Sequence, residues 1–275
     1  MQIKVLAENT SAFENFGSEH GLSLYIETNN HKILFDTGAS SLFAENAGKM
    51  NVDLSGVDVA VLSHGHFDHG GGLKVFTDIN SKAKIFCRRS AFENHYAKRP
   101  NGDIDYIGLD GTLLETNSNR FAFCGEQLII DKELELFSGV KGDRLYPPGN
   151  SNLLIQAGDS FFADDFSHEQ NLIIRENGKS VLIVGCAHRG IVNIIEHYRT
   201  SEVGLPDYII GGFHLKYNGN NDDNRDIISQ IGRYLSDTQV RYYTCHCTGI
   251  EAFDRLKTIM GDQIDYISAG SQLEI

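Results

Sequence analysis

The stretch Ser63-His64-Gly65-His66-Phe67-Asp68-His69-Gly70-Gly71-Gly72 (SHGHFDHGGG) places three histidines and an aspartate directly after an apolar run. That run, residues 57–62, is typical of a buried strand. Imidazole and carboxylate groups are ligands that suit Zn²⁺, Mn²⁺ or Fe²⁺. The stretch therefore predicts a metal-binding loop at a strand end, with glycines that allow a tight backbone path into the next helix.

The spacing inside this loop indicates two adjacent sites. His64 and His66 are two residues apart, so their side chains can hold the same ion. If Asp68 and His69 point away from that ion, they would hold a second, neighbouring ion. Further ligands must then come from distant sequence. Candidates stand at the boundaries of other predicted strands: His168, Cys186, His188, His214 and His246.

The segment Tyr-Tyr-Thr-Cys-His-Cys-Thr-Gly at 242–249 offers three donors in a row. Strand alternation places Cys245 and Cys247 on one face and His246 on the other. We therefore expect His246 to be a ligand and the two cysteines to be buried as small apolar groups.

Composition narrows the classes of partner. The chain has 275 residues and a formal net charge of −13, and 41% of its residues are hydrophobic. Nucleic-acid and anionic-membrane binding depend on clustered basic residues, so a small-molecule substrate is favoured. The N-terminal residues lack a secretion signal, and five cysteines at irregular spacing indicate reduced thiols, so we expect a cytoplasmic protein. Nothing in the sequence indicates an oligomeric state.

Hydrophobic periodicity predicts one α/β domain over residues 1–275. Strands are expected at 3–8, 21–28, 31–38, 58–64, 83–88, 152–157, 171–176, 180–185, 207–211, 241–246 and 264–268, and helices at 41–49, 71–80, 190–199, 224–235 and 249–260. This order favours two mixed sheets stacked face to face with helices outside. Residues 89–150 show no sustained period and end near Tyr-Pro-Pro-Gly at 146–149, so we expect an insertion or lid there.

Five short motifs together resemble one family. They are LSHGHFDHGGGL at 62–73, LFDTG at 34–38, GCAHRGIVN at 185–193, GGFHL at 211–215 and HCTG at 246–249. The chain resembles the metallo-β-lactamase superfamily, and within it a subfamily of metal-dependent hydrolases related to 7,8-dihydropterin-6-methyl-4-(β-D-ribofuranosyl)-aminobenzene-5'-phosphate synthase. The resemblance implies an αββα sandwich with two divalent ions at one edge, zinc in the first instance and manganese or iron as alternatives.

The resemblance also implies a ligand set. His64, His66 and His188 would hold the first metal, and Asp68, His69 and His246 the second. Superfamily hydrolases commonly present a bridging aspartate where this chain has Gly-Cys-Ala-His, so Cys186 is a possible ligand, and His168 competes with His188.

Three further residue groups receive predicted roles. Asp36 resembles a carboxylate that orients a ligating histidine by accepting its N–H, although a turn-forming role is an alternative. His214 is the candidate for holding a substrate oxygen or passing a proton to a leaving group, with a merely hydrogen-bonded histidine as the alternative. A basic cluster is predicted to bind the substrate anion if it folds over the metals, or else to be solvated: Arg88, Arg89, His95, Lys98 and Arg99.

Paired metals lower the pKa of bound water from about 16 to about 7, which makes a metal-bound hydroxide available. The leading hypothesis is a hydrolase of a small anionic ester, most readily a phosphoester, with Asp68 orienting the nucleophile. One alternative is a transferase that joins a dihydropterin diphosphate to an aminobenzene ribose-phosphate. Others are an iron-dependent redox protein and a metal-bound binding protein on the same fold.

Overall fold

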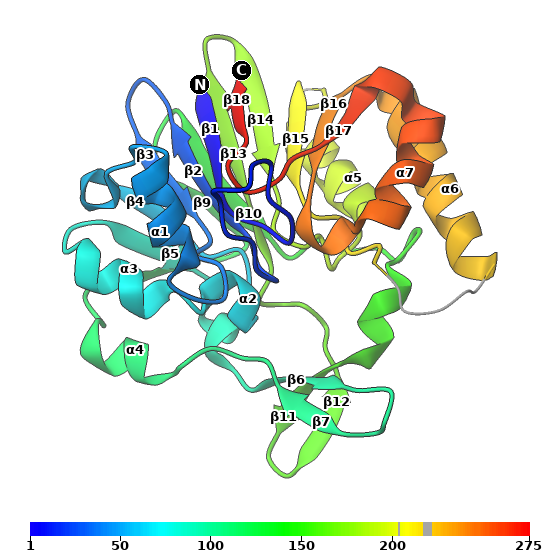
Figure 1. The fold of residues 1–275 in the computed structure, drawn as a ribbon. Coiled ribbons are helices and arrows are strands. Elements are labelled where there is room, and N and C mark those ends of the chain that lie inside the picture. The colour runs from blue at the N-terminus through cyan, green and yellow to red at the C-terminus, as the bar shows by residue number, and fades with distance from the viewer. Residues whose placement is uncertain (203, 217–221) are drawn as a thin grey trace.

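The computed structural model describes residues 1–202, 204–216 and 222–275, and over these residues the strands form two mixed sheets stacked face to face (Figure 1). The first sheet has the order β18 (Gln272–Glu274), β1 (Gln2–Ala7), β2 (Ser23–Glu27), β3 (Lys32–Phe35), β4 (Val59–Val61), β5 (Lys84–Cys87), β8 (Phe121–Phe123). The second has the order β17 (Ile264–Tyr266), β16 (Arg241–Thr244), β15 (Tyr208–Gly211), β14 (Lys179–Ile183), β13 (Gln170–Glu176), β10 (Leu134–Ser138), β9 (Gln127–Ile129). The predicted αββα architecture is confirmed.

Strand alternation fills three apolar layers. In β3, Ile33 and Phe35 face the second sheet, whereas Leu34 faces the helices outside. In β14, Val181 and Ile183 face the first sheet while Leu182 faces outward. Because both faces of these strands are buried, their sequences read as continuous apolar runs.

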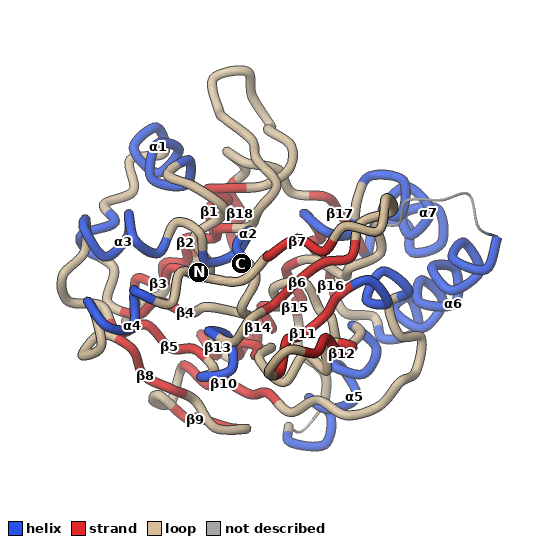
Figure 2. Tube along the Cα trace, turned by 90° about the horizontal axis from the view of Figure 1, so that it is seen from below, coloured by secondary structure: helices blue, strands red, loops and turns tan. Residues whose placement is uncertain are grey.

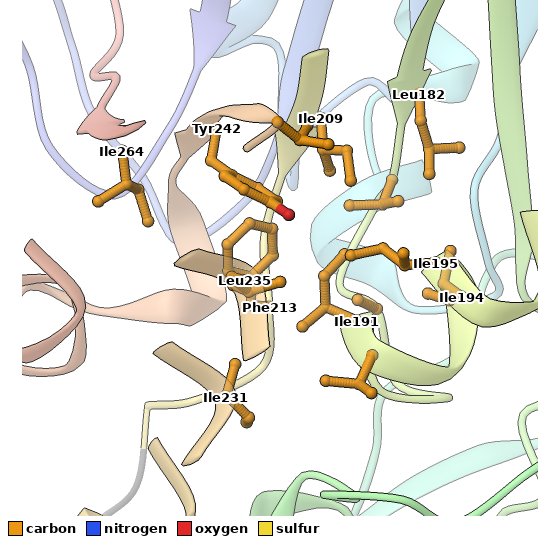
Figure 3. Close-up of a cluster of buried hydrophobic side chains, with 14 of the residues drawn as sticks. Leu182, Ile191, Ile194, Ile195, Ile209, Phe213, Ile231, Leu235, Tyr242 and Ile264 are labelled. Atoms are coloured by element: carbon orange, nitrogen blue, oxygen red, sulfur yellow. The ribbon is translucent and has the colours of Figure 1, made fainter. Parts of the chain in front are cut away.

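Helices cover the two outer faces, as Figure 1 shows. The first sheet carries α1 (Leu42–Lys49) and α3 (Leu73–Ile79), with α4 (Thr112–Thr116) beyond them. The second carries α5 (Ile191–Ser201), α6 (Asp222–Thr238) and α7 (Ile250–Met260). Ile191, Ile195 and Leu235 from these helices pack with Phe213 and Tyr242 (Figure 3). Within the described residues, no helix is both long enough and apolar enough to cross a membrane.

Parallel pairing brings distant loops to one edge of the sandwich. Strands β3, β4, β5 and β8 are parallel to one another, and so are β14, β15, β16 and β17. The carboxyl ends of parallel strands lie at the same edge of their sheet, and ligand sites form there. The loops after β4, β14, β15 and β16 carry the histidine motifs.

The range 89–150, expected as an insertion or lid, is divided among three sheets. Strand β8 extends the first main sheet, and β9 and β10 extend the second, with every residue of β10 buried. Strands β6 (His95–Lys98) and β7 (Ile104–Tyr106) instead join β11 (Leu153–Ala157) and β12 (Ser160–Ala163) in a separate four-stranded sheet. Figure 2 shows this outer sheet in front of the sandwich. A lid movement of this part of the chain remains a prediction.

Truncation of Leu136 in β10 tests how far this range belongs to the core. Leu136 is 1% exposed and packs between the sheets, so Leu136→Ala should lower the free energy of unfolding by about 2–5 kcal/mol. Ile129→Ala in the adjacent β9 is the control, because Ile129 is 65% exposed and its loss should cost under about 0.5 kcal/mol. Denaturant midpoints measure the stability of both variants. Equally small shifts in the two midpoints would contradict the assignment of β10 to the core.

Candidate metal centre

The loop that begins with Ser63 follows β4 and leads into the short helix α2 (Phe67–Gly70). Gly71 and Gly72 have ordinary φ values of −62° and −80°, so their backbone conformation does not require glycine. Glycine is needed instead because another segment of the chain packs closely against both positions. A Cβ at Gly71 would lie 2.4 Å from the carbonyl oxygen of Ala39, and one at Gly72 would lie 2.4 Å from that of Thr37. The loop is therefore pressed against the chain that follows β3.

A first donor group consists of His64, His66 and His188. The Nε2 atoms of His64 and His188 lie 3.3 Å apart, and both side chains are buried. His64 Nδ1 lies 2.8 Å from Ser63 Oγ, and the Ser63 hydroxyl donates to a neighbouring carboxylate, so the hydroxyl oxygen accepts from Nδ1–H. The side-chain amide of Asn150 donates to the His188 carbonyl, and its oxygen accepts from His188 Nδ1–H at 3.0 Å. Both Nε2 atoms therefore turn unshared electron pairs toward each other.

His66 completes this group. Within the described part of the chain its buried Nε2 has no hydrogen-bond partner, and one ring nitrogen each from His64, His66 and His188 lies within 4.8 Å of the others. Burial, followed by repulsion between neighbouring imidazoles, lowers the pKa of all three rings well below the usual value. Neutral imidazoles with inward lone pairs fit a divalent cation.

A second donor group consists of Asp68, His69 and His246. The Nε2 atoms of His69 and His246 lie 3.2 Å apart, and Asp68 Oδ2 lies 3.3 Å from His246 Nε2 and 3.9 Å from His69 Nε2. On the far side of the rings, Asp36 Oδ2 lies 2.6 Å from His69 Nδ1 and Asn9 Oδ1 lies 2.8 Å from His246 Nδ1. These partners direct both Nε2 atoms at the same space as Asp68.

The charges around the second group favour a cation. Burial raises the pKa of Asp68, but His69 and His246 outweigh burial and hold it well below its usual range. Burial lowers the pKa of His69, but Asp36 and Asp68 outweigh burial and raise it to about 9. Two buried carboxylates thus require positive charge between them, which a metal ion or a proton on His69 supplies.

Asp36 lies where its predicted supporting role requires. It accepts from the Ser63 backbone N–H at 2.7 Å, from the Ser63 hydroxyl at 2.7 Å and from His69. Its φ of 59° is unusual for a residue other than glycine. Asp36 therefore fixes both the start of the metal-binding loop and the orientation of His69.

Two buried glutamates that sequence reasoning missed hold the other loops. Glu169 accepts from the backbone N–H groups of His188 at 2.6 Å and Arg189 at 3.0 Å, and burial raises its pKa to about 7. Glu8 accepts from the backbone N–H of His246 at 2.6 Å. Neither belongs to a local motif, although Glu8 is the last residue of the strand predicted at 3–8 and Glu169 stands just before the strand predicted at 171–176.

The expectation that Cys245 and Cys247 share one face and are both buried as apolar groups is wrong for Cys247. Cys245 packs between the sheets, whereas the Cys247 sulfur lies within 4.8 Å of donors from Cys186 and His246. Strand alternation ends at Thr244, because His246 has a φ of 53° and begins a 3₁₀ turn over His246–Thr248. His246 and Cys247 therefore face the same centre.

His168 supports the metal-binding loop. Its Nδ1 accepts from the Gly65 backbone N–H at 2.9 Å, and its Nε2 lies 3.2 Å from Asp164 Oδ2. Its donors lie close enough to His66 for a metal group that also includes His95 and Asp164, but both ring nitrogens are already hydrogen-bonded. These bonds favour His188 over His168 as the third imidazole of the first site.

Most of the basic cluster predicted to bind an anion has structural partners. The ring of His95 contacts Asp164 Oδ2 at 3.0 Å and the Ser90 carbonyl at 3.1 Å, and the side chain is fully buried. Arg88 donates to backbone carbonyl groups, among them that of Cys124 at 2.7 Å. The Arg89 guanidinium lies 3.9 Å from the centre of the Phe123 ring.

A cavity of about 220 Å³ opens beside both donor groups. Arg99 lines it, whereas Lys98 is exposed on β6 and lies outside its lining, so Arg99 alone of the predicted cluster reaches the cavity. Lys216 and His20 add basic groups that sequence reasoning missed, since both stand in irregular segments without a motif. Leu153 and other apolar residues of the outer sheet and of α2 complete the wall.

His214 also lines this cavity, as a role in handling substrate requires. Its ring centre lies 4.2 Å from that of His188, and its Nδ1 is buried without a hydrogen-bond partner among the residues that the structure describes. A φ of 50° and a bond from its backbone N–H to the Cys247 sulfur at 3.2 Å fix its position. The alternative of a histidine that is merely hydrogen-bonded in place stays open.

These features are an αββα sandwich with clusters of histidine, aspartate and cysteine at one edge that could hold metal ions. The chain belongs to the metallo-beta-lactamase superfamily, whose family model matches residues 17–238. It is 32% identical over 261 residues to the uncharacterized protein MJ0448 of Methanocaldococcus jannaschii, covering 94% of each chain.

Two other relatives bear names that describe an activity. The 7,8-dihydropterin-6-methyl-4-(beta-D-ribofuranosyl)-aminobenzene-5'-phosphate synthase of the same organism is 27% identical over 299 residues, covering 98% of this chain and 95% of that protein. The crystal structure of Tm1679, described as a metal-dependent hydrolase of the beta-lactamase superfamily, is 30% identical with a TM-score of 0.84 and covers 100% of this chain and 99% of that one.

Acid should destabilise the metal-free protein. In the unfolded chain His64, His66 and His188 take up protons near pH 6.5, but burial keeps their pKa well below that value in the fold. The unfolded state therefore binds more protons below pH 6.5, so stability decreases as the pH falls through that value. The raised pKa of His69 does not oppose this trend, because its contribution is complete below pH 6.5. The raised pKa of Glu169 does oppose it, because the folded protein takes up that proton below about pH 7, but the three imidazoles outweigh this one carboxyl group.

Melting temperatures of chelator-treated protein measure this effect. They should fall steadily from about pH 6.5 to about pH 5.5. A melting temperature that is constant or rises over this interval contradicts the burial of neutral imidazoles.

Proposed function

We propose that the protein is a metal-dependent hydrolase of a small anionic ester, most readily a phosphoester. The observation that carries this proposal is the pair of adjacent donor groups that open on one cavity with basic side chains in its wall. Membership of a superfamily of mostly metal-dependent hydrolases supports it. The donor atoms and the charge balance described above are those that two divalent cations require.

His64, His66 and His188 would hold one cation, and Asp68, His69 and His246 the other. Bound cations supply Lewis acidity and make water a nucleophile near neutral pH. The imidazole donors suit zinc, with manganese or iron as alternatives.

Asp68 and His214 are the candidates for work on substrate and water. Asp68 is held ionised and lines the cavity, so its oxygens accept hydrogen bonds and orient an attacking water. His214 lines the cavity, and its Nδ1 has no hydrogen-bond partner among the described residues, so its ring is the candidate to bind a substrate oxygen or to pass a proton to a leaving group.

Arg99 and Lys216 supply the positive charge that an anionic substrate needs. Arg99 is also paired with Asp105 at 2.7 Å, and both side chains are about half exposed. A phosphate or carboxylate group that enters the cavity can exchange this exposed contact for a charge-assisted bond to the guanidinium.

A transferase is the second candidate, because the chain is 27% identical to a dihydropterin-related synthase over 95% of that protein. In that reaction the metals and basic groups would stabilise a departing diphosphate. Incubation with a pterin diphosphate separates the two candidates. Release of diphosphate only in the presence of the aryl acceptor supports transfer, and release without it supports hydrolysis.

Replacement of His66 tests the hydrolase proposal. His66→Ala removes an imidazole from the first donor group and should reduce turnover below detection while the circular dichroism spectrum stays unchanged. The substrates are a panel of phosphomonoesters, phosphodiesters, thioesters and lactones. The control His31→Ala removes a histidine that pairs with Asp58 and Asp131 outside the cavity, and it should retain activity. Activity of His66→Ala near that of the parent would refute the assignment.

A further inference from the structure

We propose that Cys186 supplies a thiolate ligand shared by the two donor groups, so that the centre binds metal through sulfur as well as nitrogen and oxygen. This inference rests on the metal centre of the proposed function. It adds a ligand type that determines which cations the centre retains.

The position of the sulfur relative to both donor groups carries the proposal. Cys186 Sγ lies 3.1 Å from His69 Nε2 in the second group, and with His64 and His69 it forms a set of donors within 4.8 Å of one another. It forms further sets of this kind with His188 and His214, and with His246 and Cys247. One sulfur atom therefore lies within ligand spacing of histidines from both groups.

The surroundings of Cys186 are those of a ligand. The residue is 3% exposed, yet it packs with none of the three apolar clusters, in contrast to Cys87, Cys124 and Cys245. Its sulfur instead contacts His69 Nε2, and further histidine nitrogens and the Cys247 sulfur lie within ligand spacing. A buried thiol placed only to fill space would contact carbon atoms.

Cys247 is the competing sulfur, but the backbone already engages it. Its Sγ accepts from the His214 backbone N–H at 3.2 Å and lies 3.5 Å from the Cys186 carbonyl oxygen. Cys186 Sγ lies 3.1 Å from His69 Nε2, whereas Cys247 Sγ is grouped with His246 only within 4.8 Å. The geometry thus assigns the metal bond to Cys186.

Metal binding by Cys186 releases a proton: the S–H bond breaks, a sulfur–metal bond forms, and the proton passes to solvent. A thiolate favours zinc, iron or cadmium over magnesium or manganese, which prefer oxygen donors. The centre should therefore retain soft or borderline cations selectively.

Cobalt substitution tests the sulfur bond independently of activity, because a thiolate bound to Co²⁺ gives a charge-transfer band in the near ultraviolet. The full-length protein loaded with Co²⁺ should show this band. Cys186→Asp, which replaces the thiolate with a carboxylate, should bind the same number of cobalt equivalents and lack the band. Cys186→Ser provides a second variant with the same expected loss.

Two cysteine variants are the controls. Cys247→Ser removes the neighbouring thiol, and Cys124→Ser removes a thiol of the apolar core, and both should keep the band. A band of parental intensity in Cys186→Asp, or its loss in Cys247→Ser, overturns the proposal. Parental protein that binds cobalt without the band overturns the sulfur ligand alone, whereas failure to bind cobalt or zinc overturns the proposed function as well.

Discussion

The candidate centre depends on one electrostatic constraint, which is that buried imidazoles turn unshared electron pairs into the same small volume. His64 faces His188, and His69 faces His246, at 3.2–3.3 Å between Nε2 atoms. Rings in this arrangement repel one another unless positive charge lies between them, and a metal ion or a proton on His69 can supply that charge. The constraint extends outward, because each ring must give its other N–H to an acceptor. Four residues fill that role: Ser63, Asn150, Asp36 and Asn9.

Buried carboxylates hold the loops that carry these rings. Asp36 binds the backbone N–H at the start of the loop after β4, Glu169 binds the loop after β14, and Glu8 binds the loop after β16. Burying such charges costs free energy, which the hydrogen bonds and the metal charge must offset. The two sheets supply the rigid frame, since parallel strands end at the same edge and bring residues more than 170 positions apart within hydrogen-bond distance.

Local patterns predicted the sheets, the helices and the main histidine loop because apolar periodicity and strand ends are visible over a few residues. Local patterns could not predict contacts between residues of the two sheets, which are far apart in the sequence. The left-handed backbone conformation of His246 directs Cys247 to the face opposite the one that strand alternation predicts. His95 was predicted to bind an anion, but it is buried and contacts Asp164. Lys216 and His20 reach the cavity from irregular segments. Strand β10 was missed because it is short and lies among polar, glycine-containing residues.

The metal content of the protein tests the central claim most directly. Protein is incubated with Zn²⁺, freed of unbound metal by gel filtration and analysed by mass spectrometry of the elements. We expect about two zinc ions to be retained per chain, as a two-metal site requires. A folded chain that retains no zinc, manganese or iron would contradict the proposal that the two donor groups hold cations.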